Sequence, residues 1–167
     1  MIKSLLLLIT IMLYCLCNSC SRSGHRKVND RNELATASER KNIVPIEKIN
    51  DVYQIRVAIN GIPMHFIFDT GAGMISISET EALFLYKQGT LTSDDIKGTS
   101  NFSDANGGIS EGTVINLKKV TIGSRTLQNV PASVVHNLQA PLLFGESALE
   151  QFGKVSIDYR LKEVTFE

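Results

Sequence analysis

The chain has 167 residues, a length typical of one globular domain, with 17 basic and 17 acidic side chains. This charge balance provides no strong field for nucleic acid or for acidic substrates. There is also no tryptophan and no run of aromatic residues between basic ones, so the composition argues against a nucleic-acid-binding protein.

The first 19 residues have the pattern of a signal peptide. Lys3 supplies a positive charge, and an almost unbroken apolar run extends from Leu5 to Cys17. This run is shorter than the about 20 residues of a membrane-spanning helix and fits a secretory signal. Ser19 and Cys20 resemble the cleavage site and the lipid-modified first residue of a bacterial lipoprotein, although Cys17 stands where such signals usually carry Leu. We expect an exported protein of the cell envelope or periplasm, anchored to the membrane through Cys20. Simple secretion and an uncleaved anchor are the alternatives.

The next segment, residues 20–42, predicts a polar tether. It contains many charged residues and few apolar ones, so it cannot bury enough surface to offset its ordering entropy. All three cysteines, Cys15, Cys17 and Cys20, lie at or before its start. The folded domain is therefore expected over residues 43–167, without a disulfide, a thiol nucleophile or a cysteine-containing metal site.

Short apolar runs begin at Ile43. Residues 43–46 predict an edge strand, because an edge tolerates the proline at position 45. Residues 52–59 and 62–68 predict a hairpin, since the Asn60-Gly61 pair between them is a strong hairpin signal. The second strand runs into Asp69-Thr70-Gly71-Ala72-Gly73, which places a carboxylate in a tight turn at the end of a buried strand. An ordinary hairpin corner is the alternative interpretation, because these residue types are common in turns.

The rest of the chain predicts more short strands and two short helices. Ser78 and Glu81 form a capping box for a helix over 79–87, and Gly153 ends a second helix over 146–152. Residues 88–100 predict a loop or a short helical turn, and residues 102–112 contain the glycine-rich tip of a second hairpin. The remaining strands are expected at 75–77, 113–122, 127–135, 141–145 (in a central position), 154–159 and 161–166. Because βαβ units are missing, the fold class is all-β, a barrel or a sandwich.

Three features follow one another in a fixed order. They are the strand ending in Phe68-Asp69-Thr70-Gly71-Ala72, the hairpin with Ala105-Asn106-Gly107, and the apolar strand Leu142-Leu143-Phe144-Gly145. A helix and a last β-hairpin come after them. This order resembles the retropepsin-like aspartic proteases, in particular their single-domain bacterial members, from about Val44 to Glu167. The resemblance implies a single-lobe acid-protease barrel with two short helices.

The resemblance also implies that Asp69 is the catalytic residue. Such enzymes hold one water between two carboxylates, one ionised and acting as base, the other protonated and acting as acid, because two close like charges share a proton. Only one Asp-Thr-Gly occurs in the chain, so a symmetric homodimer is implied, each copy giving one Asp69. Thr70 would brace the two loops across the axis, and Gly71, Ala72 and Gly73 would form the floor of the site.

Other residues acquire implied roles around the substrate. Ala105, Asn106, Gly107 and Gly108 would form a flap that closes over an extended peptide bound as an added strand. Leu142, Leu143 and Gly145 would support the Asp69 loop from beneath. The chain departs from retroviral members at Gly73-Met74, where they carry further acids, and at Gly145-Glu146, where they carry Gly-Arg. The Arg–Asp brace near their dimer interface is therefore missing.

No cofactor or metal is expected. The three histidines, His25, His65 and His136, are scattered, and the domain has no cysteine to complete a zinc site. The nucleophile elbow of serine hydrolases and the phosphate-binding loop are also missing. The predicted function is an exported aspartic endopeptidase. A non-catalytic lipoprotein that binds peptides with the same fold is one alternative, and a structural lipoprotein with a chance motif is another.

Overall fold

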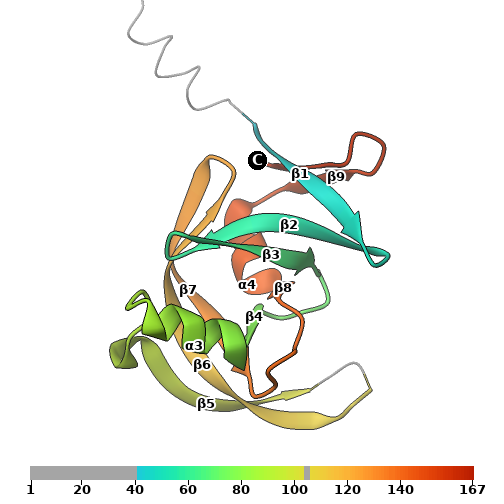
Figure 1. Ribbon diagram of the computed structural model, residues 1–167. Helices are drawn as coiled ribbons and strands as arrows, with labels where there is room; N and C mark the ends of the chain where they lie inside the picture. Colours follow the sequence, from blue (N-terminus) through green and yellow to red (C-terminus); the bar gives the residue numbers. More distant parts are fainter. Residues whose placement is uncertain (1–40, 104–105) are drawn as a thin grey trace, which may run out of the picture. The chain divides into compact units, whose positions relative to one another are not determined.

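The computed structural model describes residues 41–103 and 106–167, which fold into one ten-stranded sheet with two short α-helices (Figure 1). The strands are β1 (Asn42–Ile49), β2 (Val52–Ile59), β3 (Ile62–Phe68), β4 (Ile75–Ser78), β5 (Ile96–Ser103), β6 (Ile109–Ile122), β7 (Arg125–Val135), β8 (Leu143–Phe144), β9 (Val155–Asp158) and β10 (Glu163–Phe166). The helices are α3 (Glu79–Lys87) and α4 (Glu146–Leu149), and the 3₁₀ turns are η1 (Ser93–Asp95) and η2 (Glu150–Phe152).

The middle of the sheet closes into a barrel through β6. The strand order is β5-β6-β7-β4-β8-β3-β2-β1-β10-β9, and β6 also pairs with β2, where Val120 lies opposite Ile59. The strands from β6 to β2 in this order form a closed ring, because the first and last of them are also hydrogen-bonded to each other. The predicted all-β barrel with two short helices is therefore confirmed.

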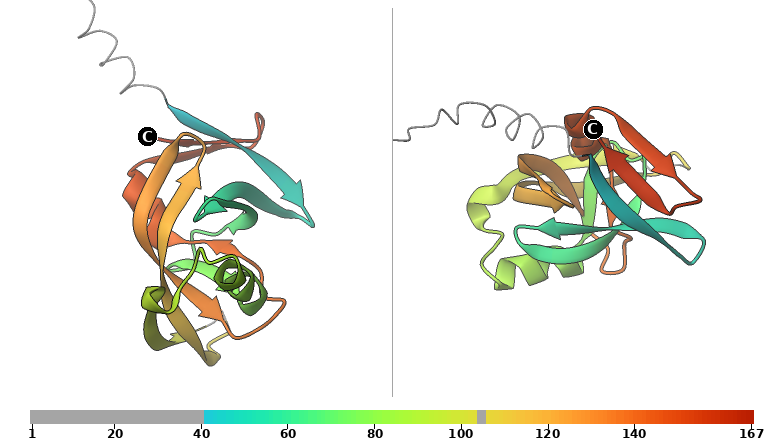
Figure 2. Two further views of the ribbon diagram at one scale, coloured as in Figure 1. Left: turned by 60° about the vertical axis from the view of Figure 1, so that its left-hand side comes forward. Right: turned by 90° about the horizontal axis from the view of Figure 1, so that it is seen from above.

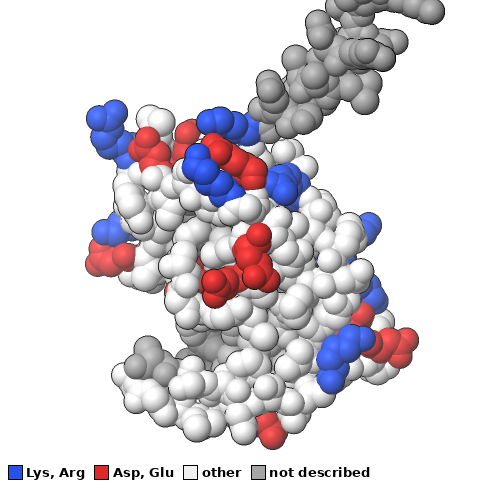
Figure 3. Space-filling model, turned by 180° about the vertical axis from the view of Figure 1, so that it is seen from behind, with Lys and Arg blue, Asp and Glu red and all other residues white. Residues whose placement is uncertain are grey.

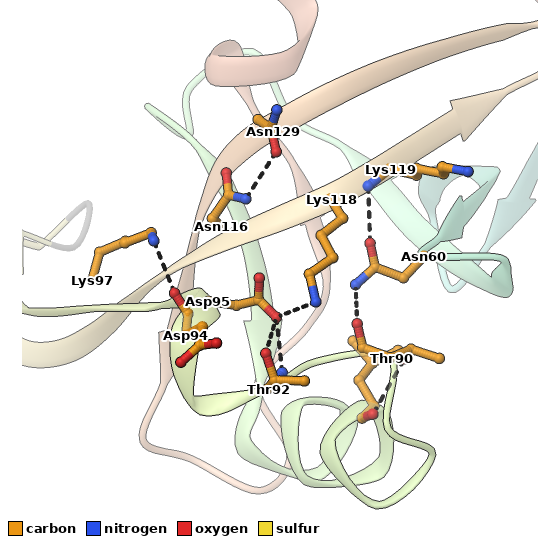
Figure 4. A network of polar contacts seen from close by, with 11 residues as sticks. Asn60, Thr90, Thr92, Asp94, Asp95, Lys97, Asn116, Lys118, Lys119 and Asn129 are labelled. Carbon is orange, nitrogen blue, oxygen red and sulfur yellow. Dashed lines mark hydrogen bonds and ion pairs between the residues drawn. The ribbon is translucent and has the colours of Figure 1, made fainter.

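The β2–β3 hairpin forms as its turn residues predict. Asn60 and Gly61 both have positive φ, 50° and 90°, as a two-residue hairpin turn requires. The Asn60 side chain also donates to the Thr90 carbonyl oxygen (2.8 Å) and accepts from the Lys119 backbone N–H (2.9 Å). The turn therefore holds the hairpin against both the loop after α3 and strand β6 (Figure 4).

Strand β1 lies between β10 and β2 in the strand order, but it pairs on one side at a time: its first half pairs with β10 and its second half, from Ile46, pairs with β2. Pro45 is tolerated because this part of the strand has a neighbour on one side alone, so the missing N–H removes no hydrogen bond on the other side. The strand also begins at Asn42, which was assigned to the tether. The buried Asn42 side chain donates to the Ile122 carbonyl oxygen and accepts from the Ser124 N–H, both at 2.9 Å.

Helix α3 begins at the predicted cap. The Ser78 hydroxyl accepts from the Glu81 backbone N–H at 3.4 Å and hydrogen-bonds the Glu81 carboxylate. The prediction of a loop over 88–100 is wrong from Ile96 onward, where β5 begins. Strand β5 is exposed along nearly its whole length and mostly polar, so it lacks the alternation by which a half-buried strand is recognised.

A buried acid fixes the turn between α3 and β5. Asp95 is 4 % exposed. Its carboxylate accepts from the backbone N–H and hydroxyl of Thr92 (2.8 Å each) and forms an ion pair with Lys118 at 2.9 Å. Figure 4 shows these groups converging on one carboxylate from η1 and β6. The contacts hold η1 against β6.

The core is continuous with the last hairpin. Four phenylalanine rings contact one another in series, with centroids 6.3, 6.5 and 4.6 Å apart, from Phe66 through Phe144 and Phe152 to Phe166. Figure 2 shows the β9–β10 hairpin beside β1, with which β10 pairs. None of the helices in residues 41–103 and 106–167 has the length and apolar character needed to cross a bilayer.

Candidate active site

Asp69 lies directly after β3, at a strand end held from both sides. Strand β2 pairs with β3 up to Ile67, and β8 pairs with it in parallel on the other side, with Phe144 opposite Phe68. The Ile67 N–H donates to the Leu142 carbonyl oxygen at 2.8 Å, and the Asp69 N–H donates to the Phe144 carbonyl oxygen at 3.3 Å. The backbone that carries Asp69 is therefore fixed by two neighbouring strands.

The turn itself orients the carboxylate. The Gly71 N–H donates to Asp69 Oδ1 at 2.9 Å, and the Ala72 N–H donates to the Asp69 carbonyl oxygen at 3.4 Å. A β-carbon at Gly71 would lie 3.2 Å from the same Oδ1, closer than ordinary contact. The result is a half-buried carboxylate with one oxygen held by the backbone.

Helix α4 supports the floor of the turn. The Glu146 and Ser147 N–H groups, at the start of the helix, donate to the carbonyl oxygens of Ala72 (2.8 Å) and Gly73 (3.1 Å). Gly145 makes this contact possible, because a β-carbon there would lie 2.6 Å from the Ala72 carbonyl oxygen and would also collide with Met74. Gly145 therefore lies against the floor of the Asp69 turn, where the close approach of the two backbones requires a residue without a β-carbon.

Ser147 is a supporting residue that sequence analysis missed. Its buried hydroxyl accepts from the Ile75 N–H at 3.0 Å and donates to the Pro131 carbonyl oxygen at 3.1 Å. One side chain thus ties α4 to β4 and β7. Serine in the first turn of a helix is common, so no local pattern indicates this role.

The other predicted site residues fall in three places. Thr70, Gly71 and Gly73 are exposed in the Asp69 turn, and Leu142 and Leu143 are half-buried at β8 beside β3. Asn106, Gly107 and Gly108 form the described part of the β5–β6 tip, where Gly107 has φ 81°. Ala105, Cys20, the signal peptide and residues 20–40 of the tether lie outside the described residues.

The two histidines in the described part of the chain do not converge on the Asp69 turn. His65 is exposed on β3 opposite Arg56, and His136 Nε2 forms a hydrogen bond with the Thr113 hydroxyl at 2.9 Å. His25 lies outside the described residues. Within the part of the chain that the structure describes, no three His, Cys, Asp or Glu side chains are grouped to hold a metal ion.

Two hollows flank the Asp69 turn. One, of about 280 Å³, contains Asp69, and the other, of about 250 Å³, contains Thr70. Phe68 and Ile157 belong to the walls of both, which are mainly apolar. The face seen from behind carries side chains of both charges toward its rim, and a few acidic side chains lie in its largely uncharged centre (Figure 3).

Asp51 is the one other aspartate in these hollows, and it does not complete a carboxylate pair. It lines the hollow that contains Asp69. Its side chain, however, is 96 % exposed and forms an ion pair with Lys48 at 3.0 Å. Within the described residues, Asp51 is therefore paired with Lys48 and not with Asp69.

Comparisons with known proteins agree with this arrangement. The model of the family described as "gag-polyprotein putative aspartyl protease" matches residues 55–151, which include the Asp69 turn, the β5–β6 tip, β8 and α4. Among solved structures, the chain is similar to a retropepsin-like aspartic protease from Rickettsia conorii, with 24% sequence identity and a TM-score of 0.55. The likeness covers 75% of this chain and 97% of that chain, and it concerns the fold. None of the curated proteins matches.

Proposed function

This chain belongs to the gag-polyprotein aspartyl protease family, and from that membership we propose that it is an aspartic endopeptidase whose active site takes one Asp69 from each of two copies. One observation carries the proposal: Asp69 is held at a doubly paired strand end, with Oδ1 bound by the Gly71 N–H at 2.9 Å. A preorganised carboxylate of this kind can activate a water without rearrangement.

The proposed chemistry needs both copies. The ionised Asp69 takes a proton from the water while the water oxygen attacks the carbonyl carbon of the scissile bond. The protonated Asp69 of the second copy gives its proton to the carbonyl oxygen. The tetrahedral intermediate then breaks its C–N bond. The first Asp69, now protonated, gives its proton to the leaving nitrogen, and a hydroxyl of the intermediate gives a proton to the second Asp69, which restores the starting carboxyl pair. Proton sharing between two close carboxylates sets up these opposite roles in a symmetric site.

The peptide is proposed to bind as an extended strand between the Asp69 turn and the β5–β6 tip. The exposed glycines of both elements leave room for a backbone to approach. Asn106, Gly107 and Gly108 would act as the flap, and Thr70 would meet its copy across the axis. The contacts from Gly145 and Ser147 to the floor of the turn support this role, because a rigid floor keeps the carboxylate aimed at the substrate.

The test compares Asp69→Asn with wild type on a mixed peptide library, from acid to neutral pH and over a range of protein concentrations. Asp94→Asn, an exposed aspartate in η1, is the matched control. We expect Asp69→Asn to lower cleavage by about a hundredfold to ten-thousandfold, and the control to cleave like wild type. Cleavage by Asp69→Asn at the wild-type rate contradicts the proposal. Peptide binding without cleavage, by a protein shown to be dimeric, supports the non-catalytic alternative.

We also propose that the protein is exported and anchored through lipid on Cys20. The support is the residue pattern alone: a positive charge, an apolar run and a small residue before this cysteine. Metabolic labelling with palmitate tests it. Wild type is expected to incorporate label and to be processed in a globomycin-sensitive manner, whereas Cys20→Ser does neither. An unlabelled wild-type protein contradicts the proposal.

A further inference from the structure

A third hollow, which we call the α3 hollow, lies between helix α3 and the sheet. Its volume is about 210 Å³, and its walls come from α3, from the segment that follows this helix, and from β5, β6 and β7. None of its lining residues lines either hollow beside the Asp69 turn. Pockets for drug-sized ligands begin at about 300 Å³, so the α3 hollow suits a smaller ligand.

The walls of the α3 hollow are mainly apolar. Ile115 and Val134, on neighbouring strands, are buried in it. Leu83, Tyr86 and Ile96 also line it, and they remain 47, 54 and 47% exposed. Leu83 and Tyr86 are three residues apart on one face of α3, and Ile96 lies opposite Ile115 in the β5–β6 register. Large apolar side chains that stay exposed around a depression are typical of a site where a ligand covers them.

One end of the α3 hollow is polar and carries an unpaired acid. Glu79, Thr113 and His136 line it, and the Thr113 hydroxyl lies 2.9 Å from His136 Nε2. The Glu79 N–H donates to the Asn137 carbonyl oxygen at 3.4 Å, which holds the start of α3 beside His136. Glu79 is half-buried, and its carboxylate forms no hydrogen bond or ion pair with any other described residue. A partly buried charge without a partner in the protein favours a ligand of opposite charge.

We propose that the α3 hollow binds a small amphiphilic cation, a ligand whose apolar group fills the hollow and whose ammonium group pairs with the Glu79 carboxylate. The apolar group covers the exposed parts of Leu83, Tyr86 and Ile96, and the carboxylate gains the partner that it lacks within the described residues. The site is separate from the Asp69 turn, so the inference goes beyond the proposed protease activity and does not depend on it.

The test titrates the full-length chain with phenethylamine and with phenethyl alcohol, in which a hydroxyl replaces the ammonium group, and follows the backbone amide signals by NMR. We expect both probes to shift the signals around Leu83 and Thr113, and the amine to bind about threefold to tenfold more tightly. Glu79→Gln should abolish this preference and leave the binding of the alcohol unchanged. Glu47→Gln makes the same change at an exposed position of β1, outside the hollow, and is the control.

A second pair of variants tests the apolar wall. Leu83→Ser should weaken the binding of both probes by about threefold to tenfold, because it removes apolar surface from the hollow. Phe84→Ser, at a position of α3 that is 45% exposed but does not line the hollow, should leave both unchanged. Thermal unfolding checks that each variant is folded.

Three results overturn the proposed site. The first is equal affinity of wild type for the amine and the alcohol, and the second is a set of shifted signals confined to the Asp69 turn. The third is binding of the dipeptide leucyl-argininamide without binding of the amine, because the occupant is then a peptide and not a small cation.

Discussion

At the residue scale, the most demanding position in the site is Gly145. Its backbone lies so close to the Asp69 turn that a methyl group would press on the Ala72 carbonyl oxygen, at 2.6 Å. We expect Gly145→Ala to lower the free energy of unfolding by about 1–3 kcal/mol, because the turn or α4 must move to admit the methyl group. Urea unfolding measures the change. Gly73→Ala is the control, since a β-carbon there meets no atom within 4 Å, and equal losses in the two variants contradict the argument.

The environment of the Asp95 carboxylate makes the stability of the fold depend on pH. Burial favours its neutral form, but the hydrogen bonds from Lys118 and Thr92 outweigh burial and hold the pKa below its ordinary value of 3.8. A lowered pKa in the folded state means that the carboxylate stabilises the fold above that ordinary value. The contribution is lost as the pH falls through the lower, folded-state pKa.

We therefore expect Asp95→Asn to lower the free energy of unfolding by about 1–3 kcal/mol at neutral pH, since a buried ionic acceptor is lost. The difference from wild type should shrink below about pH 4, where wild type loses the same interaction. Urea titrations from pH 3 to 7 measure it. Asp94→Asn removes the exposed neighbouring acid and should not change stability at any pH. A difference for Asp95→Asn that stays constant to pH 3 contradicts the assignment.

At the scale of elements, Ser147 joins three of them. Ser147→Ala removes the acceptor of the buried Ile75 N–H and the donor to Pro131, which unties α4 from β4 and β7. We expect a loss of about 1–3 kcal/mol in the free energy of unfolding. Ser133→Ala is a matched control, because Ser133 is also buried and contacts Ile75, but through a long hydrogen bond of 3.5 Å. A larger loss in the control than in Ser147→Ala contradicts this role.

Elements with strong local signals were predicted well. The β2–β3 hairpin agrees with its predicted bounds because its alternating strands and Asn60-Gly61 turn are local patterns. Helix α3 agrees for the same reason, since its cap lies within its own sequence. Strand β5 was missed because a polar edge strand has no buried face, and the pairing of β1 with β10 was missed because these two strands are distant in sequence.

At the scale of the whole molecule, an active site shared by two copies predicts that inactive subunits lower the peptide cleavage activity of wild-type subunits by pairing with them. When one part of wild type exchanges with nine parts of Asp69→Asn, random pairing leaves each wild-type chain a wild-type partner in about one pairing in ten. Peptide cleavage per wild-type chain should therefore fall about tenfold. If excess Asp69→Asn leaves the peptide cleavage per wild-type chain unchanged, the result contradicts a site built from two copies.

The sequence by itself determined the catalytic candidate and the family of folds. An apolar strand that ends in Asp69-Thr70-Gly71, a hairpin turn and a helix cap are local patterns, and each is set by residues a few positions apart. The single Asp-Thr-Gly likewise predicts that a second copy is needed, since the chemistry requires two carboxylates.

Only the tertiary structure decided what holds Asp69 in place and which residues line the α3 hollow. The support from β8, Gly145 and Ser147 comes from residues more than 70 positions further along the chain, and the α3 hollow brings together residues from α3, β5, β6 and β7. Such contacts depend on strand pairing and packing across the barrel, which local periodicity does not specify, because one apolar strand can pair with any of several others.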